Sequence, residues 1–511
     1  MYSSMILKGF TKLAKRRWLL LVGFLGLGGA ISAAVIPNLF PFLDPTGLVS
    51  TYNLNGPIDE KGVFFQSLGT NGRSCGTCHI AANAMGLSVQ NIQTRFELTG
   101  GRDPLFASVD GANCPGATAG NPAAHSLLLK SGLIRIPLQM PANAQFTIQA
   151  LRDPYGCAVV TDPASGVQTV SVYRRPLPTT NLKFLSTIMF DGRETIQPLN
   201  DPHTSMANLI QDLMHQSIDA TLTHAQASAA PTLDQQTAIV NFEMGLFSAQ
   251  SFDFQAGVLN ADGAQGGPIN LSQQNYYPAI NDSLGTDPAG PFNSTAMTLF
   301  APWANLRSSD RSFNGQQIEA RQRIAAGEAI FNTRAFMISK VRGLNDNAAL
   351  AKALGSSVPI PQFQGFCTTC HDTPNVGDHS LPLPLDIGTG HDLANENDPE
   401  IASAVSKLGF PDVPVFKITG CPNPFADPSQ PASAPYLIFT TDPGKGLISG
   451  LCSDVNRTKG PVLRGLAARA PYFHNGAAQN LEQLVDFYNQ RFQMNLTEEE
   501  KTELIAFLNS L

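Results

Sequence analysis

Two short motifs in this chain combine residue types that can hold a redox cofactor. One is CGTCH at 75–79 and the other is CTTCH at 367–371. C-x-x-C-H is the attachment signature of a c-type haem: two thiols bond to the porphyrin vinyl groups, and the histidine ligates the iron. A structural zinc site also uses C-x-x-C, but it does not explain a histidine after each pair. The motifs predict two covalently bound haem c groups, attached at Cys75, Cys78, Cys367 and Cys370 and ligated by His79 and His371.

Four further cysteines fall as one pair in each half of the chain: Cys114, Cys157, Cys421 and Cys452. Three connectivities are open to them. In an oxidising compartment the simplest is the local one, which joins Cys114 to Cys157 and Cys421 to Cys452.

The N-terminus carries a targeting pattern. Basic residues between Lys8 and Arg17 precede an apolar run from Trp18 to Ile36, with small residues near its end. This arrangement predicts export by a signal peptide over residues 1–36, although the run is also long enough to act as an uncleaved membrane anchor. Haem attachment outside the bacterial cytoplasmic membrane agrees with a periplasmic or exported protein, membrane-anchored if the segment is retained.

Composition limits the partners. The 511 residues carry a net charge of -7, only 14% are charged, and Gly (44) and Pro (37) are plentiful. The acidic balance argues against nucleic acid and suits docking of a basic redox protein. The length predicts two or three domains, and the Gly and Pro content predicts long ordered loops.

The elements that would position the motifs are mostly helices. Residues 318–331 and 232–247 are predicted helices, and Thr497 with Glu500 forms a capping box before a C-terminal helix whose apolar face would close the second haem pocket. Residues 131–173 alternate between apolar and polar residues and are expected to form short strands or extended loops. The sequence thus predicts a mainly α fold of two cytochrome c-type haem domains with loop and short-strand insertions. The predicted segments are a linker (37–60), an N-terminal haem domain (61–249), a connection (250–315) and a C-terminal haem domain (316–511).

Segments around both motifs resemble a known family. LRGL at 463–466, APYFHNG at 470–476 and FDGR at 190–193 are similar to signatures of bacterial dihaem cytochrome c peroxidases. That superfamily includes the tryptophan-modifying dihaem enzyme of methylamine dehydrogenase maturation. The resemblance does not cover the insertions near 100–180 and 250–315. It implies a peroxidase-like oxidoreductase: electrons from a small c-type cytochrome or cupredoxin enter at the C-terminal haem and reduce hydrogen peroxide at the N-terminal haem. Dimers are common in the family.

At the second haem, the resemblance places the distal ligand fourteen residues after His474, at Tyr488. The peroxidases have methionine there and the tryptophan-modifying enzyme has tyrosine. Tyr488 as a packed helix aromatic and Met494 as the ligand remain alternatives, and His474 is expected to line the pocket.

At the first haem, the resemblance places Gln226 near the acid–base glutamate of the peroxidases, with His224 two residues before it. Glutamine cannot carry a proton, whereas His224 could, unless it is a structural histidine. Arg193 and Phe190 belong to the same expected catalytic group, Phe190 replacing the tryptophan between the haems.

The position of the family's switching histidine is Arg95, so this haem is expected to be five-coordinate or to use Met85 or His125. Family members also bind calcium between the lobes, which here would use the carbonyls of Arg469 and Pro471. Two other functions stay open: oxidation or oxygenation of an organic or protein substrate, and pure electron transfer.

Overall fold

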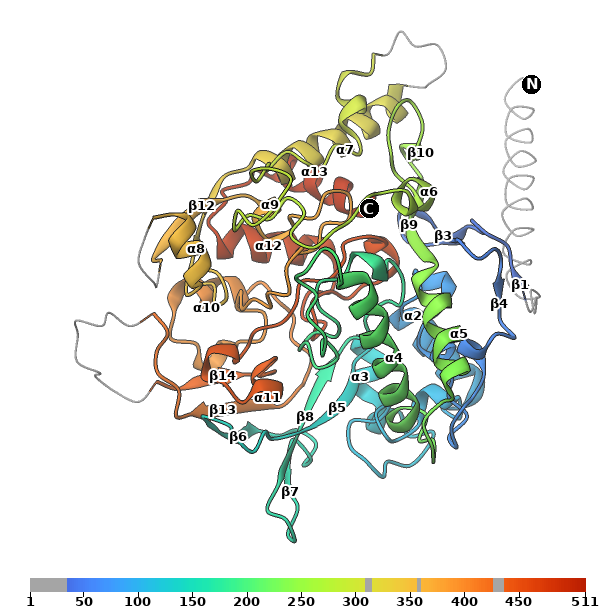
Figure 1. Ribbon diagram of the computed structural model, residues 1–511, viewed down its shortest axis with the longest axis vertical. Coiled ribbons are helices and arrows are strands. Elements are labelled where there is room, and N and C mark those ends of the chain that lie inside the picture. Colours follow the sequence, from blue (N-terminus) through green and yellow to red (C-terminus); the bar gives the residue numbers. More distant parts are fainter. Residues whose placement is uncertain (1–34, 308–314, 356–359, 426–435) are drawn as a thin grey trace, which may run out of the picture.

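A computed structural model describes residues 35–307, 315–355, 360–425 and 436–511 of the chain (Figure 1). The predicted signal peptide or anchor therefore lies almost entirely outside the described residues, and it stays a prediction. Within the described ranges, no helix is both long enough and apolar enough to cross a membrane.

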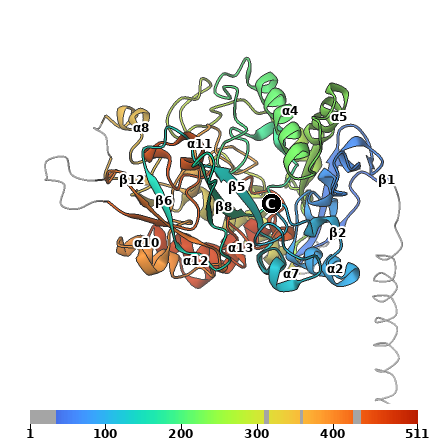
Figure 2. The same ribbon diagram turned by 90° about the horizontal axis from the view of Figure 1, so that it is seen from below.

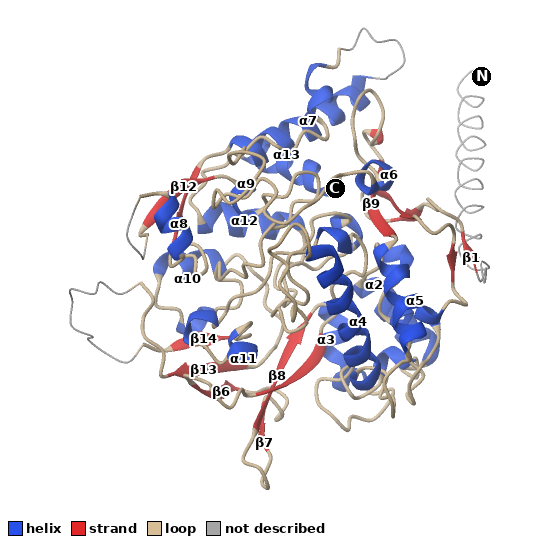
Figure 3. Cartoon of the chain, in the orientation of Figure 1, coloured by secondary structure: helices blue, strands red, loops and turns tan. Residues whose placement is uncertain are grey.

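The prediction of a mainly α fold is wrong. The structure is 32% helical and 15% strand, and its strands form several small sheets between loops (Figure 3). Glycine and proline interrupt the chain so often that many apolar segments are too short for helices and pair as strands instead. The helices are α2 (Val89–Thr99), α3 (Ser126–Ser131), α4 (Ser205–Thr223), α5 (Leu233–Met244), α6 (Pro268–Ser272), α7 (Gly315–Thr333), α8 (Ala348–Ala353), α9 (Cys367–Cys370), α10 (Pro399–Val405), α11 (Gly446–Ser449), α12 (Leu481–Arg491) and α13 (Glu498–Asn509).

The strands include one that lies in the segment predicted to be a linker. Strand β3 runs through 47–53, is mostly buried and pairs along its whole length with β9. The strands are β1 (Val35–Ile36), β2 (Phe42–Leu43), β3 (Gly47–Asn53), β4 (Ile58–Asp59), β5 (Ile134–Gln139), β6 (Thr147–Arg152), β7 (Val159–Thr161), β8 (Gln168–Arg174), β9 (Leu246–Asp253), β10 (Gly257–Val258), β11 (Phe336–Ser339), β12 (Gln362–Gly365), β13 (Val415–Thr419) and β14 (Ile438–Thr440). Strands β5 to β8 confirm the predicted strands of residues 131–173.

One sheet joins the two halves of the chain. Its order is β14-β13-β6, so β6 from the first half lies antiparallel beside β13 from the second, with Ile148 opposite Ile418 (Figures 1 and 3). Both side chains are buried in a common hydrophobic cluster. The disulfides Cys114–Cys157 and Cys421–Cys452 confirm the predicted local pairing.

The second half is built around α7, α12 and α13. The hydroxyl of Thr497 accepts the N–H of Glu500 at 3.2 Å, and the Glu500 carboxylate accepts the N–H of Thr497 at 2.9 Å. This capping box starts α13 as predicted. Leu504 and Phe507 are buried on its inner face against α7.

In the first half, α4 and α5 pack side by side, as both views show (Figures 1 and 2). The hydroxyl of Thr232 accepts the N–H of Gln235 at 3.3 Å and starts α5. The helix predicted over 232–247 ends at Met244, because Leu246 already begins the buried strand β9. Helices α4 and α5 present residues toward the first motif, as described below.

Candidate active site

Both C-x-x-C-H motifs fold into the same local turn. In the first, the N–H of His79 donates to the carbonyl of Cys75 at 3.0 Å. In the second, the N–H of His371 donates to the carbonyl of Cys367 at 3.0 Å. One helical turn thus places both thiols of each motif near its histidine.

The threonine directly before the second cysteine of each motif fixes the start of that turn. Thr77 Oγ1 accepts the N–H of Ser74 at 3.0 Å, and Thr369 Oγ1 accepts the N–H of Phe366 at 2.9 Å. Both bonds satisfy a backbone donor at the turn's N-terminus. The two motifs therefore share a capping device in addition to their cysteine spacing.

Each motif histidine is oriented through one ring nitrogen. His79 Nδ1 lies 3.3 Å from the carbonyl oxygen of Met85, and His371 Nδ1 lies 2.6 Å from that of Gly377. A carbonyl partner at Nδ1 sets the tautomer and leaves the Nε2 lone pair for a metal. Burial lowers the pKa of His79 to about 4, so its imidazole is neutral, the form that binds iron.

Each motif lines its own cavity. The first cavity, beside Cys75, Cys78 and His79, encloses about 1150 Å³ of atom-free space with its open mouth included. The second, beside Cys367, Cys370 and His371, encloses about 1730 Å³ measured in the same way.

The four motif cysteines remain free thiols, whereas the other four form disulfides. Burial raises the pKa of Cys75, Cys367 and Cys370 to about 12 and that of Cys78 to about 11, so all four are neutral. Neutral thiols and imidazoles lining large cavities fit a haem c in each.

The two cavities share a wall. Arg175, Pro176, Leu177 and Phe190 line both of them. Phe190 is 7% exposed, and its ring lies 6.0 Å from that of His474 in an edge-on arrangement. Phe190 therefore lies between the two cavities, where it was expected to replace the tryptophan of the peroxidases.

A histidine–carboxylate–arginine chain lines the first cavity. His224 Nδ1 contacts the Asp110 carboxylate, which also pairs with Arg73. Arg73 further donates to the carbonyls of Pro104 and Leu105, each at 2.7 Å. Although burial opposes it, the hydrogen bond from His224 and the Arg73 charge hold the pKa of Asp110 below its usual range. An ionised Asp110 orients the imidazole and leaves Nε2 for other partners.

Gln226 does not reach this cavity. It adopts a left-handed backbone conformation, with φ of 54°, and its exposed side chain accepts from Asn71 Nδ2 at 3.4 Å. His224 stays at the cavity because it directly follows α4, whereas the chain turns away two residues later. Arg193 does line the cavity and binds Asp191 at 3.0 Å.

Glu243 is a cavity residue that the sequence reasoning missed. It lies on α5, is 5% exposed and lines the first cavity. Its Oε1 accepts from the Thr179 hydroxyl at 2.7 Å, while Oε2 has no hydrogen-bond partner among the described residues. Burial raises the pKa of Glu243 to about 7. A lone glutamate in the apolar stretch 238–247 was the signal that could have found it.

The alternative ligands proposed for the first haem lie elsewhere. His125 is buried against the carbonyl of Gly111 at 2.8 Å, and Met85 is packed in the core behind His79. Neither lines the first cavity. Arg95 binds Asp103.

The second cavity is lined mainly by aromatic and aliphatic side chains, and Tyr488, Met494 and His474 are among its lining residues. Tyr488 stacks on Phe492 with ring centres 6.2 Å apart, and within the described part of the chain its hydroxyl makes no hydrogen bond. Burial raises the pKa of Tyr488. Burial lowers the pKa of His474 to about 4, so it is neutral. All three expected residues therefore reach this cavity.

The residues expected to hold calcium do not fit that ion. The carbonyl oxygen of Arg469 accepts from Arg175 Nη2 at 3.1 Å, and the carbonyl of Leu87 accepts from the same nitrogen at 2.6 Å. A buried guanidinium thus already occupies the position that a cation would take beside the Arg469 carbonyl. No step below involves calcium there.

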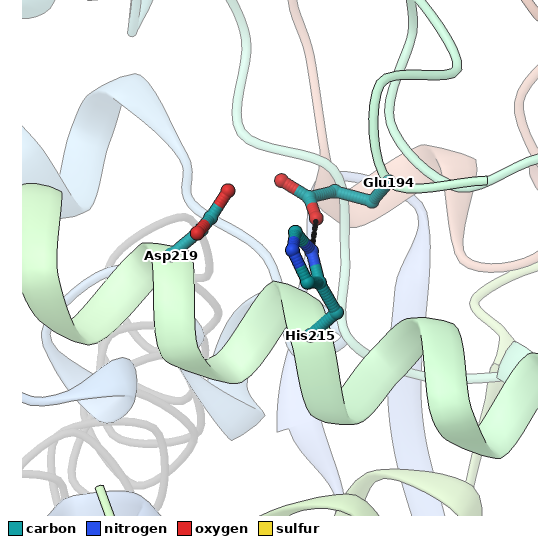
Figure 4. A group of neighbouring side chains, drawn as sticks. All are labelled: Glu194, His215 and Asp219. Carbon is teal, nitrogen blue, oxygen red and sulfur yellow. Dashed lines mark hydrogen bonds and ion pairs between the residues drawn. The ribbon is translucent and has the colours of Figure 1, made fainter. Parts of the chain in front are cut away.

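A polar cluster lies near the first cavity on the face of α4 (Figure 4). His215 Nδ1 lies 2.9 Å from Glu194 Oε2, and Asp219 follows one turn along the helix. The side chain of His215 is 46% exposed. The histidine and glutamate already partner each other, so the cluster is explained as an ion pair between a partly exposed histidine and a buried glutamate.

Comparison with known proteins gives relatives over part of the chain, although no family model matches it. Cytochrome-c peroxidase IdrP2 of Denitromonas iodatirespirans is 30% identical over 173 residues, which are 32% of this chain and 41% of that protein. Cytochrome-c peroxidase IdrP1 of a Pseudomonas species is 27% identical over 178 residues, with the same shares. Cytochrome c551 peroxidase of Nitrosomonas europaea is 32% identical over 107 residues, 19% of this chain and 32% of that protein.

The chain thus spans about two fifths of the length of the first of these relatives. Their shared name agrees with the resemblance read from the motifs around residues 190 and 470. The chain is a relative of the bacterial cytochrome c peroxidases.

Proposed function

We propose that this protein is an exported dihaem oxidoreductase that reduces hydrogen peroxide in the first cavity with electrons entering through the second. The observation that supports this most strongly is the pair of motif-lined cavities with one common wall. Oxidoreductase activity of the peroxidase type also accords with the names of the relatives. Haem c, when bound, supplies a redox-active iron in each cavity.

The chain's own residues would hold the two groups in matching ways. Cys75 and Cys78 would form thioether bonds in the first cavity, with His79 Nε2 toward the iron. Cys367, Cys370 and His371 would do the same in the second. The carbonyls of Met85 and Gly377 fix the two imidazole rings.

Reduction of peroxide to two waters consumes two protons and two electrons, so the first cavity must move protons. His224, oriented by Asp110, can accept the proton of one peroxide oxygen at Nε2 and deliver it to the other, departing oxygen. Glu243, whose pKa is about 7, can hold and release a further proton at neutral pH. Arg73 keeps Asp110 ionised, which keeps the imidazole in place.

The electron donor is proposed to be a small redox protein, a c-type cytochrome or a cupredoxin. The net charge of -7 favours encounter with a basic partner. The two disulfides suit an oxidising compartment such as the periplasm.

Steady-state turnover tests this proposal. Peroxide-dependent oxidation of a reduced small c-type cytochrome should be sustained by the purified protein carrying both haems. It should fall sharply in His224→Gln but persist in His203→Gln, which alters an exposed histidine next to α4. No turnover by a protein with both haems intact would contradict the proposal.

A second candidate function is oxidation of an organic or protein substrate. One observation favours it: the half-buried Tyr488 lines the second cavity, and its hydroxyl has no hydrogen-bond partner among the described residues. A tyrosinate ligand stabilises oxidised iron. A long-lived spectral change after peroxide is added without a donor, together with no cytochrome oxidation, would support this function over the first.

A further inference from the structure

Three buried side chains form a cluster beside the second motif, outside the residues used above. Asp282, Asp372 and His379 each offer a ligand atom, and these atoms all lie within 4.8 Å of one another. The residues are 0%, 1% and 5% exposed, respectively. The cluster thus differs from an acidic patch on the surface, where solvent would neutralise the charges.

Two loops bring these residues together. Asp282 belongs to the connection between the halves, whereas Asp372 and His379 follow the second motif. Asn281 Nδ2 donates to the carbonyl of Asp372 at 3.1 Å, and the N–H of Ala279 donates to the carbonyl of Ser380 at 3.1 Å. These bonds hold the two loops side by side without using the carboxylates.

In each of the two carboxylates, one oxygen accepts a hydrogen bond and the other has no hydrogen-bond partner among the described residues. Asp282 Oδ2 accepts from the Thr286 hydroxyl at 2.5 Å, and Asp372 Oδ1 accepts from the N–H of Ser380 at 2.7 Å. Asp282 Oδ1 and Asp372 Oδ2 have no hydrogen-bond partner in the described part of the chain. The first oxygens therefore fix the orientation of the carboxylates and leave the second oxygens available to a ligand.

Two further buried side chains beside the cluster are also incompletely paired. His379 Nε2 and Asp378 Oδ1 lack a hydrogen-bond partner among the residues described. His379 Nδ1 accepts the N–H of Leu381 at 3.2 Å and lies 3.3 Å from Asp372 Oδ2. Within the described ranges no Lys or Arg lies within ion-pair distance of Asp282 or Asp372, and His379 is the basic side chain there that lies beside Asp372.

Buried carboxylates persist when they are paired, protonated or bound to a metal. Oxygen ligands lie ~2.4 Å from a calcium ion, so two of them can be up to about 4.8 Å apart across it. The ligand atoms of this cluster all lie within that distance of one another. We propose that Asp282, Asp372 and His379 bind a divalent cation, with oxygen and imidazole ligands suited to calcium, manganese or zinc.

The cation would tie the connection between the halves to the loop that follows His371. It is a separate site from the position beside the Arg469 carbonyl, where Arg175 already lies. Its existence also does not depend on the reaction proposed above.

Metal analysis of the full-length protein with both haems tests the site directly. After equilibration with calcium, manganese or zinc and removal of free metal, elemental analysis should find about one divalent ion per chain in addition to the haem iron. A chelator should remove that ion and lower the melting temperature, and the bound metal should restore it. A protein that retains no ion beyond iron with any of the three metals would overturn the proposal.

Substitutions locate the ion. Asp282→Asn and Asp372→Asn should each weaken binding by at least about tenfold, because they remove a charged ligand. Asp287→Asn, which makes the same change in the same loop, should retain the ion. Full binding in both Asp282→Asn and Asp372→Asn would place the ion elsewhere and overturn the assignment. If Asp372 instead carries a proton, Asp372→Asn will keep the melting temperature and wild-type protein will hold no ion.

Discussion

The two cavities begin from the same turn but differ in what surrounds it. The first is lined by His224 and Glu243, which can exchange protons, and by Asp110, which orients His224. The second is lined mainly by aromatic and aliphatic side chains, with Tyr488 and Met494 near its histidine. Proton-coupled chemistry needs the first kind of lining, whereas transfer of an electron alone does not. This difference supports the proposal that peroxide is reduced in the first cavity and that electrons enter through the second.

A buried ion network supports the wall that the two cavities share. Arg174 in β8 is 1% exposed and lies between two carboxylates, contacting Asp191 and, at 2.6 Å, Asp442. Asp191 directly follows Phe190, and Asp442 lies 3.6 Å from His474. A buried, satisfied ion network of this kind holds the wall in one arrangement. In the proposed function, electrons would cross this wall from the second cavity to the first.

Removing the attachment cysteines should have the largest effect. Paired Cys→Ala changes at 75 and 78, or at 367 and 370, should each leave one covalent haem of two and abolish turnover. Haem staining after denaturation and peroxide assays check this. Two covalent haems in either double variant would show that the motifs are not the attachment sites.

His224→Gln should come next. Loss of a positioned acid–base group typically slows the reaction by ~10²–10⁴-fold, so kcat/KM for peroxide should fall by about that factor. Electron transfer from the donor into the second haem, followed by stopped flow, should be unchanged. An equal loss in peroxide reduction and in electron transfer into the second haem would mean that the two cavities do not carry out separate steps.

Glu243 should make stability depend on pH. Burial raises its pKa from 4.5 to about 7, so its contribution is full below pH 4.5 and is lost as pH rises through 7. By linkage this amounts to about 3 kcal/mol. The melting temperature of the wild type should therefore fall between pH 5 and pH 8 relative to Glu243→Gln. If the melting temperatures of the two proteins change with pH in parallel, Glu243 does not titrate in this range and cannot supply a proton in the cavity.

Tyr488→Phe should have the smallest effect on peroxide consumption and a clear effect on one spectrum. The substitution removes only the hydroxyl that faces the second cavity. If Tyr488 ligates there, the absorption and magnetic signals of one haem should change and those of the other should not. Unchanged spectra would leave Tyr488 as a packing residue and direct attention to Met494.

The sequence predicted the parts of the molecule whose chemistry is local. The C-x-x-C-H turns, the Thr497 capping box and the disulfides depend on residues close in the chain, and the structure contains the turns, the cap and both bridges. The sheet pairing Ile148 with Ile418 could not be predicted, because it joins segments that each read as an isolated short strand.

Contacts between distant segments account for the remaining differences. Arg175 reaches the Arg469 carbonyl across the chain, where calcium was expected, and Glu243 enters the first cavity from α5. The resemblance to the peroxidases placed Gln226 beside the first haem, but the left-handed backbone at Gln226 turns the chain away from the cavity. Spacing arguments fail where the backbone leaves regular structure.

The division of labour can be tested most directly by finding which haem responds to peroxide. Tyr488→Phe marks the signal of the second haem, so wild type and variant can be compared in magnetic resonance spectra before and after peroxide is added to half-reduced protein. We predict that peroxide first changes the signal that Tyr488→Phe leaves unaltered. A first response in the signal that the substitution shifts would contradict the assignment of peroxide reduction to the first cavity.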